Sequence, residues 1–302
     1  MATSKTQLII HYIEKPEPVI SFGFFERNKK EVIRHLHDHI QLESYQVDHG
    51  KLRDEVVLAE RIMNLSEDID GKIKDGIHFI VDSPRVLYYS MILPRMSIKK
   101  AKQMAFKELE ETFINYGEEY SVRSYAVDAK EKGIFVYFEL LPLDIIRSFT
   151  NMSEHIDKYV DSVNLGNIAL LNYFNASNVE QDDVIVIYGD EHLTLVGLII
   201  GRQLVETQAY YQALKNDETL FTRIGLGIKV MSGKHEFHFE RTCVKHVLVF
   251  VDDQEVKSSL ERYLNVEYDL DRIETDHDEF VDMLHIFFSN DDFVDYVFKL
   301  DV

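Results

Sequence analysis

The sequence predicts an α/β protein of two lobes, with a small β-α-β-β unit inserted into the first lobe. Strand-like runs of β-branched and aromatic residues alternate with amphipathic helical segments along the whole chain. The order of these segments repeats loosely in the two halves, and a polar stretch at 175–183 separates them. A further helix, turn and pair of strands interrupts the first half at about 92–142.

The first half begins with two predicted strands, at 7–12 and 18–25, because both segments are rich in β-branched and aromatic residues. A helix is predicted at 28–40, since its apolar residues recur at intervals of three and four. These apolar residues are Val32, Ile33, Leu36 and Ile40. The next predicted elements are a helix at 54–65 and strands at 77–81 and 86–93.

The inserted unit follows the strand at 86–93. Pro94 ends this strand, and Ser97 is a suitable N-cap for the helix after it. The apolar positions of that helix have the spacing of a one-faced helix, and they are Ile98, Ala101, Ala105, Leu109 and Phe113. Two strands at 119–127 and 133–141 complete the unit, and a helix is predicted at 143–159.

The second half begins after the polar stretch at 175–183, which follows a short helix. Its predicted elements are strands at 184–188, 193–200 and 202–206, a helix at 207–214, strands at 226–231 and 246–251, and helices at 256–264 and 279–298. The predicted divisions are a first lobe at 1–180 that contains the insert at 92–142, a second lobe at 181–278, and a C-terminal helix at 279–302 that returns to the first lobe.

The composition restricts the partners and the location. With 53 acidic and 33 basic residues, the net charge of −20 repels nucleic acid, so no nucleic-acid partner is expected. The single cysteine, Cys243, cannot form an internal disulfide, and its expected role is that of a small buried hydrophobe. The longest apolar stretch, at 193–200, is far shorter than the roughly 20 residues of a spanning helix. We therefore expect a cytoplasmic protein with no direct membrane span.

Four segments between Gly50 and Thr207 resemble, in succession, the PilM-type actin-like proteins of type IV pilus and competence machinery. They are 50–54 with the helix after it, 86–97 with the helix to Glu111, 116–126, and 160–170. The likeness extends to the cytoplasmic domain of GspL-type secretion proteins and, more distantly, to FtsA. It implies an actin-like (ribonuclease H-like) fold, in which the insert at 92–142 replaces a subdomain of actin.

An actin-like ATPase would need two phosphate-binding hairpins, each with an Asp and a Gly, to bring backbone amides to the phosphates and carboxylates to Mg²⁺. The first hairpin, at 8–16, has neither residue. The second keeps Gly189, but Ile187 stands where the carboxylate belongs. The adenosine turn has no glycine and carries the bulky Phe250 and Val251. We therefore expect no ATP, no Mg²⁺ and no catalysis, with Gly189 and Asp190 as the remnant of a phosphate hairpin.

Other candidate ligands have simpler interpretations. Asp190 or Asp252 could still hold a metal, but a solvated turn carboxylate is the more common role of such residues. His35, His37 and His39 would point in different directions on the helix predicted at 28–40, so they predict no metal site, although on a strand they could converge on one ion. His235 and His238 are expected on the surface of a polar strand.

The resemblance also implies a function, that of a scaffold that holds the short cytoplasmic tail of a bitopic, PilN-like membrane protein. A pilus motor ATPase would be a second partner, and these partners would recruit the protein to the inner face of the membrane. In this family the tail docks between the main part of the first lobe and its insert. The lining residues would be Tyr88, Tyr89, Met91 and Met104, with the basic rim Arg95, Lys99, Lys100 and Lys102.

Other interpretations remain open. The apolar residues of the proposed groove could be the core of the inserted unit, and its lysines could be an ordinary solvated face. The protein could also be a diverged actin-like ATPase, or an FtsA-like adaptor in cell division. A Mg-ATP titration would distinguish a diverged actin-like ATPase from a scaffold. Neighbouring genes would distinguish an adaptor in cell division from a scaffold of pilus assembly.

Overall fold

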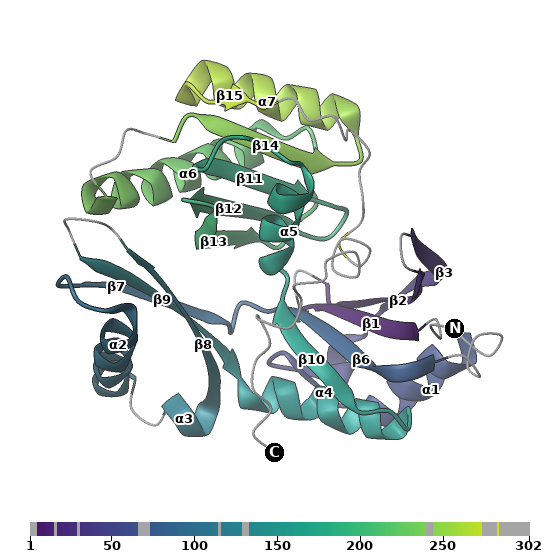
Figure 1. The fold of residues 1–302 in the computed structure, drawn as a ribbon. Coiled ribbons are helices and arrows are strands. Elements are labelled where there is room, and N and C mark those ends of the chain that lie inside the picture. The colour runs from purple at the N-terminus through teal and green to yellow at the C-terminus, as the bar shows by residue number, and fades with distance from the viewer. Residues whose placement is uncertain are drawn as a thin grey trace.

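The computed structural model describes residues 5–14, 17–28, 31–65, 73–113, 116–128, 133–239, 244–273 and Met283. These residues form two α/β lobes, one above the other in Figure 1, and a third, smaller unit beside the first lobe. Within these ranges, no helix is long and apolar enough to cross a membrane.

The first lobe is built on a five-stranded sheet of order β10-β6-β1-β2-β3. The strands are β1 (Lys5–Ile13), β2 (Val19–Asn28), β3 (Glu31–Gln41), β6 (Ile73–Asp82) and β10 (Val160–Leu165). β1, β2 and β3 are antiparallel to one another, whereas β6 and β10 run parallel to β1. Two helices, α1 (Glu55–Leu65) and α4 (Leu143–His155), cover one face of the sheet with a shared apolar cluster.

Short elements complete the first lobe. A 3-10 helix, η1 (Ser44–Gln46), leads into the two-stranded pair β4 (Val47–Asp48) and β5 (Lys51–Leu52). Leu52 of β5 is fully buried in the cluster under α1 and α4. This connection therefore closes the edge of the helical layer.

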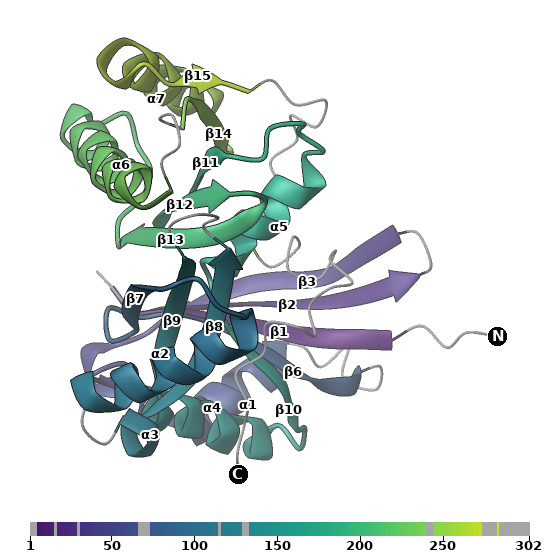
Figure 2. The same ribbon diagram turned by 60° about the vertical axis from the view of Figure 1, so that its left-hand side comes forward.

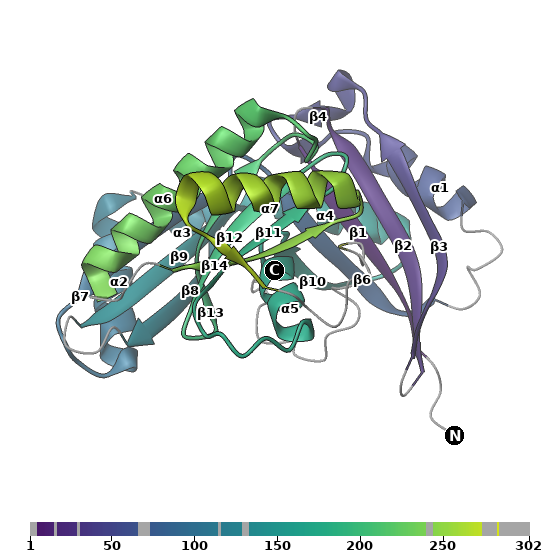
Figure 3. The ribbon, with the colours of Figure 1, turned by 90° about the horizontal axis from the view of Figure 1, so that it is seen from above.

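The second lobe repeats the pattern of the first, with a sheet of order β13-β12-β11-β14-β15. The strands are β11 (Val184–Gly189), β12 (Thr194–Ile200), β13 (Gln203–Tyr210), β14 (His246–Val251) and β15 (Asp271–Arg272). Again three antiparallel strands are followed by two that run parallel to the first. α6 (Glu218–Phe239) and α7 (Gln254–Tyr268) cover the outer face, as Figure 3 shows from above.

The inserted unit has its own three-stranded sheet of order β7-β9-β8. Its elements are β7 (Leu87–Leu93), α2 (Ile98–Thr112), α3 (Tyr116–Glu119), β8 (Tyr120–Asp128) and β9 (Ile134–Pro142). α2 packs on one face of the sheet, and the other face turns toward the second lobe (Figure 2). The predicted architecture of two α/β lobes with an inserted β-α-β-β unit is confirmed.

The two lobes share an apolar core through α5 (Ile168–Ala176), which lies between them in Figure 1. One cluster of buried residues runs from Ile9 and Phe25 of the first sheet, through Phe174 of α5, to Val186 of the second sheet. Met283 joins the same cluster. The rest of the helix predicted at 279–302 lies outside the described residues.

Three sequence-based predictions are wrong. The segment predicted as a helix at 28–40 is strand β3, and the register of β2 and β3 shifts by one residue at His35, between the pairs Phe24–Leu36 and Phe25–Arg34. This irregularity interrupts the two-residue alternation, so the apolar spacing of a strand resembles that of a helix. The helix predicted at 207–214 is instead the end of β13 and a loop, and the strand predicted at 226–231 lies within α6.

Candidate functional site

The ends of β1 and β6 meet the hairpin β11–β12 at the junction between the lobes, where an actin-like protein would hold phosphates. Glu14 follows β1 at the first of the two hairpins and is buried. Its carboxylate accepts a hydrogen bond from the Ser83 hydroxyl, and its backbone N–H donates to the Asp82 carbonyl over 2.9 Å. A buried carboxylate at this hairpin would repel a phosphate group.

A second buried carboxylate, Asp82, ends β6 beside Glu14. The Nε2 atom of His11 donates to Asp82 Oδ2 over 2.7 Å, and both side chains are almost fully buried. Burial raises the pKa of the Asp82 carboxyl, and the charge of Asp190 raises it further, whereas the hydrogen bond from His11 lowers it. Gly166 lies against this carboxylate so closely that a Cβ atom there would overlap it.

The predicted remnant of the second phosphate hairpin, Gly189 and Asp190, is committed to local contacts. Asp190 Oδ1 accepts from the backbone N–H groups of His192 (2.7 Å) and Leu193 (2.8 Å). Its Oδ2 accepts from the Tyr188 hydroxyl over 2.9 Å. Leu214 covers Gly189, so that even a Cβ atom at Gly189 would overlap it. The carboxylate and the glycine therefore shape the hairpin and its cover.

Tyr211, from the second lobe, reaches the carboxylates of the first lobe. Burial raises the pKa of its hydroxyl, and the nearby charges of Asp82 and Glu14 raise it further. The junction is thus acidic and occupied by protein side chains. No group of three His, Cys, Asp or Glu residues that could hold a metal occurs among the residues that the structure describes.

The turn expected to approach adenosine also packs against protein. Phe250 stacks on Tyr173 at a centroid distance of 4.7 Å, and Val251 is buried in the core of the second lobe. Asp252 is exposed, whereas Asp253 caps α7 by accepting from the backbone N–H groups of Glu255 and Val256. The turn therefore begins a helix and leaves its bulky residues in the core.

A second polar cluster lies where the insert meets both lobes, and we call it the three-way junction. Arg123 of β8 and Glu139 of β9 form a buried ion pair, with Arg123 Nε 2.6 Å from Glu139 Oε2. Asn167, at the start of α5, donates to Glu139 Oε1 over 2.6 Å and to the Thr207 hydroxyl of β13 over 3.3 Å. One carboxylate thus ties the inserted unit to the first lobe and, through Asn167, to the second.

Charge and burial oppose each other at Arg123. Burial lowers the pKa of its guanidinium, but the charges of Glu139, Tyr125 and Tyr88 and the hydrogen bond to Glu139 together outweigh burial, and the net pKa is raised. The hydroxyl of Tyr125 also donates to Glu139 Oε2, over 3.2 Å. The guanidinium therefore remains charged, and its contacts with Glu139 hold the neighbouring strands β8 and β9 together.

The eight predicted partner-binding residues do not come together on one surface. Along β7, Tyr89 and Met91 point toward α2 and pack on the core of the inserted unit. Tyr88 points to the opposite face, where it stacks on Tyr137 at 6.0 Å. Burial raises the pKa of the Tyr88 hydroxyl, and the charges of Glu139 and Asp82 raise it further, so the hydroxyl faces the junctions, whereas the residue as a whole is 42% accessible.

The remaining candidates lie on or near α2. Arg95, Lys99, Lys100 and Met104 are exposed, and Met104 is 40% accessible. Ser97 caps the helix as predicted, with its hydroxyl 3.4 Å from the backbone nitrogen of Lys100. Lys102 is different, because its ammonium donates to the Ser124 carbonyl of β8 over 3.0 Å and so helps to hold α2 on the sheet.

The histidines and the cysteine fall into two groups. His37 and His39 are exposed and lie on strand β3, not on the predicted helix. The side chain of His35, on the same strand, is not among the described ones. His235 and His238 lie in α6 rather than in a strand, and their side chains are not among the described ones. Cys243 also lies outside the described residues.

No protein-family model matches the sequence, and no curated protein matches it. Among solved structures, one described as a PilM-PilN type IV pilus biogenesis complex has a chain similar to this one, with a TM-score of 0.61 and 11% identity over 89% of this chain and 88% of that chain. The chain has an actin-like fold. At this identity the likeness establishes the fold alone.

Two further solved structures are similar over most of their length. An actin-like ATPase-fold protein from Bacteroides thetaiotaomicron shares 9% identity, with a TM-score of 0.47, over 89% of this chain and 91% of that one. The cytoplasmic domain of EpsL from the type II secretion system of Vibrio cholerae shares 10%, with a TM-score of 0.48, over 87% and 96%. TM-scores below 0.5 are too low to support an argument.

Sequence reasoning missed the residues that fill both junctions. Two of them carried a usable signal, because His11 and Glu139 each stand inside a run of apolar residues on a predicted strand. A polar residue in such a run is buried with it and needs a partner. The partners, Asp82 and Arg123, could not be assigned, since both pairs form between strands that the sequence alone does not align.

Proposed function

We propose that this protein is a non-catalytic adaptor of a type IV pilus or related envelope assembly machine, and that it holds the short cytoplasmic tail of a bitopic, PilN-like membrane protein. The observation that carries the proposal is the exposed basic start of α2 on the inserted unit of an actin-like fold. In a chain with a net charge of −20, this is a local surface to which an acidic tail would be attracted.

Of the eight candidate residues, Arg95, Lys99, Lys100 and Met104 form the proposed contact surface. These four residues are exposed around the first turns of α2, and Lys100 and Met104 are one turn apart. Tyr89 and Met91 would support this surface from the core of the unit. Recruitment by such a tail would bring the protein to the inner face of the membrane.

The absence of ATPase activity is part of the same proposal. It is supported by the buried carboxylates of Glu14 and Asp82, which oppose a triphosphate, and by Leu214, which covers the glycine of the second hairpin. The Tyr211 side chain occupies the same junction. The buried carboxylates and the side chains that fill the junction do not fit a Mg-nucleotide.

Charge reversal tests the contact surface. The double substitution Lys99→Glu and Lys100→Glu should weaken capture of a PilN-type tail peptide at least tenfold in a titration, since two attractive contacts become repulsive. Both side chains are exposed, so the melting temperature should not change. The matched control is Lys51→Glu with Lys215→Glu, two exposed lysines elsewhere on the chain. Equal capture by both double variants would refute this contact surface.

A separate titration tests the nucleotide. Mg-ATP at millimolar concentration should leave the melting temperature unchanged, because a ligand at 100 times its Kd would stabilise the fold by about 2.7 kcal/mol. A clear upward shift would favour the alternative of a diverged actin-like ATPase. The tail-binding surface would still be tested separately, by the titration with the tail peptide.

A further inference from the structure

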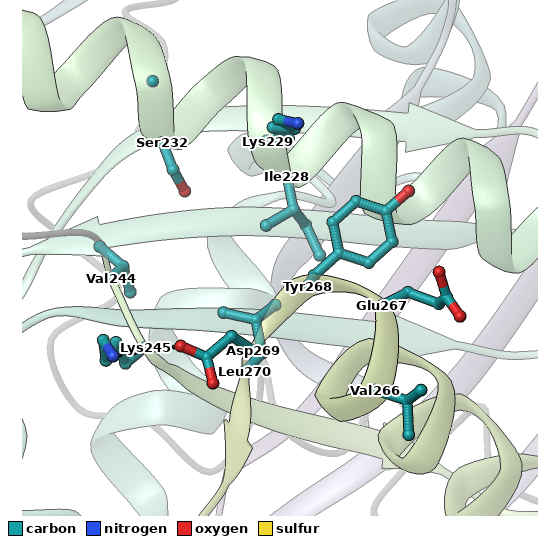
Figure 4. Close-up of a pocket in the computed structure, with 11 residues that line it drawn as sticks. Ile228, Lys229, Ser232, Val244, Lys245, Val266, Glu267, Tyr268, Asp269 and Leu270 are labelled. Atoms are coloured by element: carbon teal, nitrogen blue, oxygen red, sulfur yellow. Dashed lines mark hydrogen bonds and ion pairs between the residues drawn. The ribbon is translucent and has the colours of Figure 1, made fainter.

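A pocket lies on the outer side of the second lobe, between the C-terminal half of α6 and the end of α7 (Figure 4). Its volume is about 690 Å³, within the range of roughly 300–1,000 Å³ that is common for small-molecule sites. Apolar side chains of Ile228, Val244 and Leu270 form much of its wall, and Tyr268 closes one side. None of its lining residues belongs to the inserted unit, so its occupancy can be tested separately from the proposed adaptor role.

The hydroxyl of Ser232 lies in this pocket without a hydrogen-bond partner among the described residues. Ser232 is only 8% exposed. A buried hydroxyl that lacks a partner is unfavourable, and a helical serine can ordinarily bond to its own helix backbone. The pocket therefore presents a polar group that a bound molecule can satisfy.

A positive charge stands next to this hydroxyl. Lys229 precedes Ser232 by three residues on α6, so the two side chains lie on neighbouring positions of one helix face. Lys229 is exposed and makes no ion pair in the described part of the chain. The other lysine of the pocket, Lys245, is bound to Asp269 over 3.1 Å. Lys229 is thus the cation available to an anionic group near Ser232.

An apolar residue is also exposed at the rim. Val266 of α7, which lines the pocket, is 72% accessible. Exposed aliphatic side chains beside a partly apolar pocket are typical of surfaces that contact a ligand. Two carboxylates also line the pocket, both at the end of α7: Asp269 is paired with Lys245, and Glu267 is exposed. The hydrocarbon of the walls, together with the hydroxyl and the ammonium on α6, describes a molecule with an apolar body whose negative end lies on the α6 side.

We propose that the α6–α7 pocket binds a small amphipathic carboxylate. The hydrocarbon part lies against Ile228, Val244 and Leu270. The carboxylate accepts a hydrogen bond from the Ser232 hydroxyl and faces the Lys229 ammonium. A purely cationic ligand would meet Lys229 unfavourably, and a fully polar one would leave the apolar wall exposed to water.

The probe is decanoate, titrated into the full chain by calorimetry. Saturable binding with one site per chain is expected for the wild-type protein. The variant Gly233→Leu adds a side chain at a residue that lines the pocket, and it should weaken binding without unfolding the protein, because a Cβ atom at Gly233 meets nothing within 4 Å. The matched control is Gly117→Leu, where a Cβ atom also meets nothing within 4 Å but the residue lies on α3.

Two further variants test the polar end. Ser232→Ala and Lys229→Gln should each weaken decanoate binding about tenfold, since each removes one interaction with a charged group. Decane-1-amine, a cation of the same length, should not bind. The proposal is overturned if decanoate does not bind, if Gly233→Leu binds it as the wild type does, or if both polar variants retain full affinity.

Discussion

The ion pair at the three-way junction gives the strongest prediction about stability. Arg123→Leu should destabilise the protein, because it leaves the Glu139 carboxylate buried without its cationic partner. Glu139 is only 1% exposed, and Arg123 is 8% exposed. The guanidinium approaches Glu139 Oε2 through two nitrogens, at 2.6 and 2.5 Å, so the substitution removes both contacts.

The magnitude follows from burial and from the remaining contacts. Removing one member of a buried ion pair costs about 3–5 kcal/mol. Hydrogen bonds from Asn167 and Tyr125 still reach Glu139, which keeps the cost near the lower end of that range. At roughly 2 °C per kcal/mol for a large domain, the melting temperature should fall by about 6 °C. Circular dichroism is the suitable measurement, because the chain has no Trp to report by fluorescence.

The control removes both charges. In Arg123→Leu with Glu139→Leu, no unpaired charge remains, and Asn167 keeps its contact with Thr207. The double variant should therefore be more stable than Arg123→Leu alone by about 1–2 kcal/mol. A single variant that melts within a degree of the wild type would refute the reasoning. So would a double variant that is less stable than the single one.

Three other changes have clear signs, each checked by urea unfolding. Asp82→Asn should stabilise the protein at neutral pH, because burial raises the pKa of this carboxyl above its unfolded value of 3.8. The buried charge of Asp82 destabilises the protein only above the unfolded pKa, and this destabilisation grows as the pH rises toward the folded pKa. The stabilisation by Asp82→Asn should grow with pH in the same way, so a pH-independent gain would contradict the prediction. Gly189→Ala should cost about 1–3 kcal/mol through overlap with Leu214, and Gly117→Ala, in open space, should not; equal midpoints would contradict this. Asp253→Ala should cost about 1 kcal/mol by removing the cap of α7. An unchanged urea midpoint would contradict this.

The order of strands and helices was largely predictable, because most elements have a regular period and clear ends. α2 is the best case, with Ser97 at its N-cap and Ala101, Ala105 and Leu109 buried at the expected spacing. Ile98 was expected on the same face, but it is 47% exposed, since the first turn extends beyond the sheet that α2 covers. Period and capping therefore located the helix more precisely than they located the limits of its buried face.

α6 was missed because tertiary contacts override the local preferences of its sequence. Its glycines and Val230 disfavour a helix. Gly225, however, lies where a Cβ atom would overlap the ring of Tyr268, and Gly227 lies where it would overlap Gln208 and Tyr210. The glycines permit α6 to approach α7 and β13 closely, and this gain in packing is invisible in the sequence.

The exposure of the candidate partner residues was predictable only in part. The sequence marks Lys99 and Lys100 as a basic surface, and both side chains are exposed. It could not separate Tyr88 from Tyr89: α2 covers the face of β7 that carries Tyr89, whereas Tyr88, on the other face, stacks on Tyr137 and remains 42% accessible. Strand alternation divides such a run between two environments, and only the position of the sheet shows which residues remain accessible.

The two junctions bear on how an adaptor of this fold would work. Separating the lobes would expose the apolar cluster around α5 and would place Tyr211 and the carboxylates beside it in water. Moving the insert would break the hydrogen bonds between Glu139 and Asn167 of α5 and between Arg123 and Asn164 of β10. Both motions are costly, so the orientation of α2 relative to the lobes is fixed before any partner binds. A surface that is fixed in advance loses little conformational entropy on binding, and it needs no nucleotide to organise it. That is the property expected of a protein that holds a flexible tail, and it links the filled junctions to the proposed adaptor role.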